Sequence, residues 1–297
     1  MGIYEEIASN KHRSFFLIVL FFGMVILLGL ILGLYYGSKL FGIIFALLIG
    51  LIYFLFSWYG GAGTILAMTK AKEATKPKYA HLINTVEGIS IAAGLPKPPK
   101  VYVIEDSALN AFATGRNPEN SSVTVTTGLL EKMNRLELEG VIAHEISHIK
   151  NYDIRVMMLA SVMVGLTVLL SDFLLRSFLW GNRDRENNGF TLLLIFVGFA
   201  LAILAPFVGE VIKLSLSRKR EYLADASGAL LTRYPKGLAD ALRKIQNDPD
   251  PLVDHANKAT AHLFISTPFR KTKSSLMKNI FSTHPPIEDR IKRLEAM

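Results

Sequence analysis

Two histidines and a glutamate lie within five residues of one another near the middle of the chain. The run is His144-Glu145-Ile146-Ser147-His148. Because residues four apart project from the same face of a helix, the two imidazoles can share one metal ion. Zinc accepts nitrogen and oxygen ligands and, in a catalytic site, keeps one position for water. Glu145 would take a proton from that water as it attacks a carbonyl, which is the chemistry of peptide hydrolysis.

A helix has to carry this run, and the sequence predicts one. Asn134 followed by Glu137 fits a capping box, and the expected helix runs to about Asn151. The stretch 141–143 before the first histidine is apolar, so two histidines and a glutamate buried there would be costly without a metal or other partners. The alternative is a helix whose histidines are satisfied by ordinary hydrogen bonds.

Two histidines do not complete a catalytic zinc site, so a third ligand is needed. The later carboxylates are Asp153, which lies close to the same helix, and then Glu210, Glu221 and Asp225. A helix expected over 217–231 places Glu221 and Asp225 one turn apart. Glu221 could bind zinc while Asp225 accepts the second ring N–H of a histidine. The alternative is an exposed helix start in which Glu221 pairs with a neighbouring arginine.

The elements around this site include long apolar segments, since 51% of the 297 residues are hydrophobic. Phe15–Tyr36 is an uncharged run of 22 residues, long enough to cross a hydrocarbon core of ~30 Å as a helix. Leu40–Trp58 follows after a short polar turn. A signal peptide would have a shorter apolar region and a small-residue cleavage site. The two runs therefore predict a transmembrane hairpin.

A second apolar pair is interrupted by charge. Val156–Leu170 is followed by Asp172 and Arg176, and Phe190–Val208 comes after the polar turn 181–189. We expect either a second spanning hairpin or two helices that are buried in the protein or only dip into the bilayer. Lysine and arginine are denser on the side of the polar segments, which places those segments in the cytoplasm and the protein in the plasma membrane, crossing it several times.

The polar segments predict a small sheet beside the helices. We expect a helical stretch over 64–94 that stops at Gly94, and short strands at Lys100–Ile104 and Val123–Thr126. The fold class is then a mainly α integral membrane protein with four transmembrane helices and a zincin-type α+β catalytic domain. The expected organisation is a hairpin at 1–58, catalytic segments at 59–155 and 213–297, and the second hairpin at 156–212.

Composition excludes several classes. The chain has no cysteine, so neither disulfides nor thiolate metal sites are possible. The net charge of +8 would suit nucleic acid, but no basic stripe with interleaved aromatic residues is present, so nucleic acid is not an expected partner. The expected partners are the lipid bilayer and protein substrates.

Several motifs occur in an order that resembles the HtpX family of membrane zinc metallopeptidases, which are relatives of the CAAX-processing prenyl-protein proteases. After the histidine motif and two apolar segments comes Arg220-Glu221-Tyr222-Leu223-Ala224-Asp225, followed by Gly228. The matching stretches elsewhere are Asn110–Gly115, His148–Asp153 and Ser282–Arg290. The four apolar segments also fall where the family has them, so the resemblance covers nearly the whole chain.

This resemblance implies the metal ligands and the activity. Glu221 becomes the third ligand of one zinc ion per subunit, and Asp225 becomes the carboxylate that supports a histidine ligand. Asn151 and Asp153 are expected to give only structural or similar indirect support. The implied activity is endoproteolysis of misfolded or damaged membrane proteins, as part of membrane protein quality control.

Two further roles follow from the resemblance. The strand Asn110-Ala111-Phe112-Ala113 would be an edge strand that pairs with extended substrate backbone, or else a plain strand beside a turn. His284, which precedes two prolines, would stabilise the oxyanion formed on the substrate, or else cap the final helix.

Three rival functions remain as alternatives. A CAAX-type processing protease would have more membrane spans than the four apolar segments seen here. A metal transporter would hold its site within the membrane-spanning helices and would give Glu145 no role. A structural scaffold would need neither the histidines nor the paired carboxylates. The sequence leaves the oligomeric state open.

Overall fold

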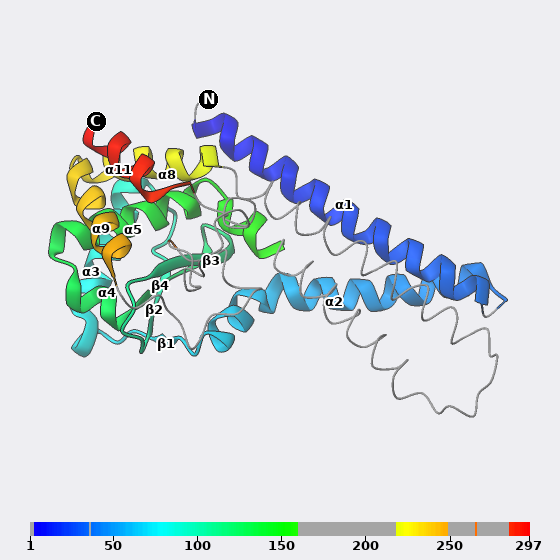
Figure 1. Cartoon of the computed structure of the whole chain (residues 1–297). Coiled ribbons are helices and arrows are strands. Elements are labelled where there is room, and N and C mark those ends of the chain that lie inside the picture. Colours follow the sequence, from blue (N-terminus) through cyan, green and yellow to red (C-terminus); the bar gives the residue numbers. More distant parts are fainter. Residues whose placement is uncertain (1–2, 36, 160–217, 249–264, 266–284) are drawn as a thin grey trace. The chain divides into compact units, whose positions relative to one another are not determined.

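The computed structural model describes residues 3–35, 37–159, 218–248, 265 and 285–297 (Figure 1). The chain divides into two compact units. The described residues of the first unit fall within 1–11, 61–158 and 216–297. Those of the second unit fall within 12–60, together with Leu159. Most of the predicted second apolar pair, from residue 160 onward, lies outside the described residues.

Among the described residues, two helices are long and apolar enough to cross a membrane. They are α1 (Ile3–Tyr35) and α2 (Lys39–Met68), with mean hydropathies of 2.4 and 2.6 over their apolar parts. Only 28% and 17% of those parts are buried, which is unlike the core helix of a soluble protein. The first two predicted apolar helices are therefore confirmed, and α2 extends beyond Trp58 to Met68.

Small residues let the two helices approach closely within the second unit. A Cβ atom added to Gly42 on α2 would lie 2.4 Å from the Gly33 Cα and the Gly29 carbonyl oxygen on α1. Gly29 and Gly33 are four residues apart, so both lie on the same face of α1. Such small-residue contacts are typical of helices that pack together in membranes, where van der Waals contact replaces the hydrophobic effect.

A mixed sheet forms one layer of the first unit. It has the order β1-β2-β4-β3, with β1 (Lys72–Glu73), β2 (Lys100–Ile104), β3 (Ala111–Asn117) and β4 (Asn120–Thr126). β2 and β4 pair in parallel, whereas β1–β2 and β3–β4 are antiparallel. The strand predicted at Lys100–Ile104 is confirmed, and the one predicted at Val123–Thr126 begins earlier, at Asn120.

The single helical stretch predicted over 64–94 is wrong. α2 ends at Met68, Lys70 has a φ of 53°, and Lys72 and Glu73 pair with β2 before α3 (Lys76–Ala93) begins. Pro77 lies in the first turn of α3, where its missing N–H has no intrahelical partner to lose. The predicted end is confirmed, because Gly94 caps α3 with a φ of 70°.

The helix that carries the histidine motif lies at the centre of the first unit. This is α5 (Arg135–Lys150), and its predicted capping box is present: Asn134 Oδ1 accepts from the Glu137 N–H at 3.0 Å, and Glu137 Oε2 accepts from the Asn134 N–H at 2.8 Å. Every residue from 141 to 149 is buried. A helix buried on all sides has to be enclosed by other elements.

Those elements are drawn from both halves of the sequence. α5 packs against α3, β3, α8 (Arg218–Thr232) and α9 (Pro235–Asn247), and α11 (Ile287–Glu295) packs on α8 and α9 (Figure 1). The short α4 (Thr127–Lys132) joins β4 to α5. Side chains such as Ile142, Ile146 and Ile149 are fully buried, and each stabilises the fold by about 1.5–3 kcal/mol. This core encloses the motif helix.

Candidate metal centre

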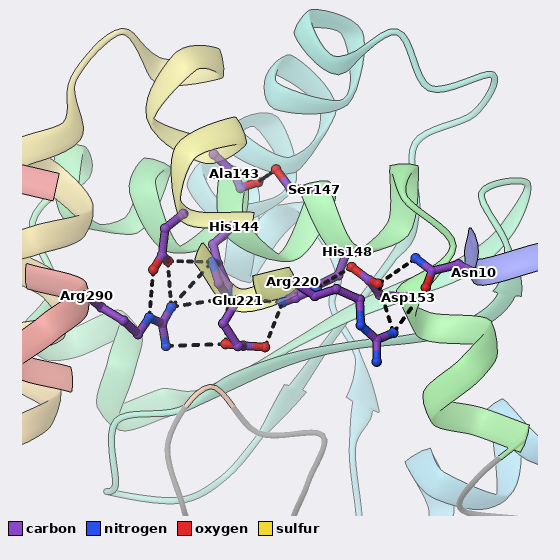
Figure 2. Close-up of polar contacts among 10 residues, drawn as sticks. Asn10, Ala143, His144, Ser147, His148, Asp153, Arg220, Glu221 and Arg290 are labelled. Atoms are coloured by element: carbon purple, nitrogen blue, oxygen red, sulfur yellow. Dashed lines mark hydrogen bonds and ion pairs between the residues drawn. The ribbon is translucent and has the colours of Figure 1, made fainter. Parts of the chain in front are cut away.

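Three side chains from two helices meet in the core of the first unit (Figure 2). His144 and His148 come from α5 and Glu221 comes from α8, and one ligand atom of each lies within 4.8 Å of the others. The two Nε2 atoms are 3.1 Å apart. Glu221 carboxylate oxygens lie 3.8 Å from His144 Nε2 and 3.6 Å from His148 Nε2. All three side chains are buried.

A close helix contact brings Glu221 to the histidines. A Cβ added to Gly228 on α8 would lie 3.1 Å from the backbone nitrogen of His144 on α5. A larger residue at this position would push the two helices apart. Glu221 is only 2% exposed, so the alternative of an exposed helix start does not describe this structure.

On the His144 side, a carboxylate and an arginine support the ring. Asp225 Oδ1 lies 3.0 Å from His144 Nδ1. The Arg290 guanidinium, from α11, donates to both Asp225 oxygens at 2.7 and 2.9 Å, and its Nη1 lies 3.5 Å from Glu221 Oε2. Burial, together with the nearby Arg290 charge, lowers the pKa of His144. His144 is therefore neutral near pH 7, as a metal ligand must be.

On the His148 side, Asp153 takes the corresponding place. Asp153 Oδ2 lies 2.9 Å from His148 Nδ1, while Oδ1 accepts from Asn10 Nδ2 at 2.8 Å and from Arg220 Nη1 at 3.2 Å. Burial alone would lower the pKa of His148, but the hydrogen bond with Asp153 and the charge of Glu221 raise it to about 9. Without a bound metal ion, His148 therefore carries a proton near pH 7, which a metal would displace.

A tight turn places Asp153 beside the helix that it follows. The Asn151 N–H donates to the Ser147 carbonyl at 3.0 Å, and Tyr152 then adopts a φ of 63°. This left-handed residue turns the chain at the end of the helix, and Asp153 contacts His148. Asp153 thus contacts a histidine rather than joining the group of three ligand atoms. Asn151 takes part through its backbone carbonyl, which accepts from Asn10 Nδ2 at 2.8 Å.

Glu145 interacts both with the ligand side chains and with the sheet. It is 3% exposed, and the Ala113 backbone of β3 makes a hydrogen bond to it. Burial raises the pKa of Glu145 to about 7, although the neighbouring His148 charge and the Ala113 hydrogen bond oppose the rise. A carboxyl group with this pKa can both take and return a proton near neutral pH.

The predicted substrate strand lies at the edge of the described sheet, because β3 pairs only with β4 there. Asn110 precedes β3, and its carbonyl accepts from the Thr126 N–H at 3.0 Å, toward β4. The Ala111 carbonyl instead accepts from the Ile265 N–H at 3.0 Å. The backbone polar groups of Ala111 and, two residues later, of Ala113 therefore face the outer edge of β3, whereas those of Asn110 face β4. His284 lies outside the described residues.

Three residues at the centre were given no role by the sequence. Arg220 and Arg290 stood within matched motifs, and Asn10 lies 143 residues before Asp153. The signal for the two arginines was charge. Four carboxylates are predicted near the histidines, and carboxylates buried together are stable only when cations are buried with them. Nothing in the local pattern around Asn10 indicates its position.

The three ligand side chains fit a bound metal ion. Each histidine has Nδ1 engaged by a carboxylate, so the two Nε2 atoms are directed to one region beside Glu221. Carboxylates that hold the second ring nitrogen fix the tautomer and the orientation of metal-binding histidines. Two nitrogen donors and one carboxylate oxygen, with a buried glutamate alongside, define the class of the protein as a metallopeptidase.

Comparison with known proteins gives the family. The model of Peptidase family M48 matches residues 77–297, and the chain belongs to this family. It is similar to the "Protease HtpX homolog" of Dictyoglomus turgidum, at 47% identity over 99% of this chain and 94% of the relative. The protein of the same name from Caldanaerobacter subterraneus subsp. tengcongensis is 44% identical, over 99% and 98%. The resemblance noted in the sequence is thereby confirmed.

A solved structure shares the fold at lower sequence similarity. The crystal structure of S. mikatae Ste24p matches with a TM-score of 0.53 and 21% identity, covering 98% of this chain and 67% of that chain. At this identity, the match supports the fold alone.

Proposed function

We propose that this metallopeptidase is a zinc-dependent endopeptidase that cleaves misfolded or damaged membrane proteins. The observation that carries the proposal is the group of three buried ligand atoms from His144, His148 and Glu221, with Glu145 beside them. Two nitrogens and one oxygen are a typical ligand set of catalytic zinc, at one ion per subunit. When bound, zinc would lower the pKa of a water molecule and polarise the carbonyl of the scissile bond.

The surrounding side chains divide the remaining work. Glu145 takes the proton of the attacking water and returns it to the leaving amine, for which a pKa of about 7 is suited. Asp225 and Asp153 hold the Nδ1 atoms of the two histidines, so both rings keep one orientation. Asn151 supports the turn that presents Asp153.

Substrate would lie extended along the edge of β3. The hydrogen bond between Ala113 and Glu145 joins this strand to the proposed general base, so a backbone paired near Ala113 would lie next to the chemistry. Within the predicted strand 110–113, the support is strongest at Ala113, because the Asn110 carbonyl accepts from β4 and the Ala111 carbonyl already accepts from the Ile265 N–H. The role of His284 as the donor to the oxyanion rests on the family resemblance alone.

The membrane assignment rests on α1 and α2 and on the family. We propose a multi-pass protein of the plasma membrane with its catalytic domain in the cytoplasm, as the distribution of lysine and arginine favours. The absence of cysteine makes a topology test simple, because a single cysteine in place of exposed Asn120 has no native thiol beside it. Labelling of intact cells by a membrane-impermeant maleimide would contradict the cytoplasmic assignment.

The activity is tested with detergent-purified protein and an unfolded protein substrate. Wild type supplied with zinc should cleave it, whereas Glu145→Gln should retain one zinc per chain and lose cleavage by at least about a hundredfold. Glu221→Gln should lose zinc as well as activity. Equal cleavage by wild type and Glu145→Gln would show that another active site or a contaminant is responsible.

A further inference from the structure

Asn10 connects the beginning of the chain to the proposed metal centre (Figure 2). It lies on α1 within the first compact unit, ahead of the long apolar run, and is 0% exposed. Its Nδ2 donates to the Asn151 carbonyl and to Asp153 Oδ1, both at 2.8 Å. Its Oδ1 accepts from Arg220 Nη1 at 3.3 Å. One side chain thus contacts the end of α5, a carboxylate and an arginine.

The two bonds from Nδ2 act on the same turn. A carbonyl at the end of a helix has no intrahelical partner, and the amide of Asn10 supplies one for Asn151. The second bond occupies Asp153 Oδ1, which leaves Oδ2 directed at His148 Nδ1. Arg220 also reaches Oδ1, at the longer distance of 3.2 Å. Together the bonds fix the rotation of the Asp153 carboxylate as well as its position.

The neighbouring residue of α1 holds the same turn from outside. Tyr152 has a φ of 63°, a conformation that costs a non-glycine residue free energy. The ammonium group of Lys11 lies 5.1 Å from the centre of the Tyr152 ring, and the guanidinium of Arg155 lies 4.7 Å from it. Lys11 therefore contacts the strained Tyr152, and Asn10 contacts Asn151 and Asp153 on either side of it.

We propose that Asn10 is a positioning residue for the metal ligand His148, acting through Asp153. The inference rests on the proposed function, since it assumes that His148 binds zinc. Asn10 donates to Asp153 Oδ1, and Asp153 Oδ2 faces His148, so its effect on the histidine is transmitted by the orientation of one carboxylate. The early part of α1 thereby contributes to the metal centre through Asn10.

Zinc affinity of the full-length, detergent-purified chain tests this proposal, measured by competition with a chromophoric chelator. Asn10→Ala should weaken zinc binding by about 3–10-fold, less than the roughly 10–100-fold expected for Asp153→Asn, which contacts the ligand directly. The double variant should bind no more weakly than Asp153→Asn alone, because the two residues act in series. Ser90→Ala, which removes a buried hydroxyl on α3 that donates to the Val86 carbonyl at 2.6 Å, should bind as wild type does.

A merely structural role for Asn10 predicts different results. It would lower thermal stability without changing zinc affinity, or its effect would add fully to that of Asp153→Asn, and either result overturns the proposal. Asn10→Ser supplies one hydrogen-bond donor where Asn10 supplies two, without adding charge or bulk, so it should weaken zinc binding even where Asn10→Ala does not fold. Failure of the proposed function looks different: the wild type would then hold no zinc, or His144→Ala would hold it equally well.

Discussion

The two histidines of the metal centre are supported by two clusters with the same plan and different construction. In each, Nδ1 faces a buried carboxylate that an arginine holds. The His144 cluster is built from helices, with Asp225 on α8 and Arg290 on α11 in a two-bond pair. The His148 cluster depends on a turn, and its carboxylate is shared by Asn10 and Arg220.

The difference shows in the charge of the rings. Arg290 lies 3.4 Å from both ring nitrogens of His144, and burial and this cation lower the pKa of His144. Arg220 contacts Asp153 Oδ1, whereas His148 faces Oδ2, and the Asp153 hydrogen bond and the Glu221 charge raise the pKa of His148 to about 9. One ligand is thus ready for a metal near pH 7, and the other must first release a proton. Burial and the Arg290 cation act on His144, whereas the Asp153 hydrogen bond and the Glu221 charge act on His148.

Replacing the two arginines should give the largest difference in stability between the two clusters. Arg290→Met leaves Asp225 and Glu221 buried without their cation, so we expect a loss of about 3–5 kcal/mol in the free energy of unfolding. Arg220→Met should cost less, because Asn10 still donates to Asp153. Urea unfolding of the metal-free proteins measures both. Equal losses would mean that the two clusters are equivalent, and Arg243→Met, at a half-exposed ion pair, is the control with a loss below about 1 kcal/mol.

Removing one carboxylate charge should lower zinc affinity on either side. Asp225→Asn and Asp153→Asn should each weaken binding by about 10–100-fold, since each carboxylate orients one ligand. The larger effect is expected for Asp225→Asn, which also leaves the Arg290 charge unbalanced beside the metal. Chelator competition measures both affinities. A larger effect of Asp153→Asn would reverse the proposed order.

The raised pKa of His148 predicts a fall in stability with rising pH. The folded chain holds this proton up to about pH 9, while the unfolded chain loses it near 6.5, so the contribution is full below pH 6.5 and is lost through pH 9. Metal-free protein should lose up to about 1.4 kcal/mol per pH unit between pH 7.5 and 9. Asp153→Asn should flatten this slope and Asp225→Asn should not. Urea titrations at each pH distinguish them.

Helix spacing should give the smallest effect. Gly228→Ala places a methyl group 3.1 Å from the His144 backbone nitrogen and should cost about 1 kcal/mol of stability, with weaker zinc binding because His144 is displaced. Gly88→Ala is the matched control, because nothing lies within 4 Å of its added Cβ inside α3. That change should stabilise the protein by about 0.5–1 kcal/mol. A stabilising Gly228→Ala would show that α5 and α8 are not in tight contact.

Local patterns predicted the parts whose physics is local. The four-residue spacing of His144 and His148, and the capping box at Asn134, depend only on helix geometry. The strand at Lys100–Ile104 followed from alternation. The single helix predicted over 64–94 is wrong because Lys72 and Glu73 pair with β2. This partner is distant in the sequence, so the local helical pattern does not indicate it.

Only the tertiary structure decided how the histidines are supported. The sequence offered Glu221 and Asp225 as a pair, but their burial beside Arg290 results from the packing of α8 on α5 and of α11 on α8. Asp153 reaches His148 because Tyr152 adopts a left-handed conformation. A tyrosine at this position does not indicate that conformation in the sequence. Asn10 joins the centre from 143 residues away. The sequence by itself thus determined which residues can bind a metal, since ligand chemistry and helical spacing are local. The fold decided their charge and orientation, since both depend on groups that only packing brings together.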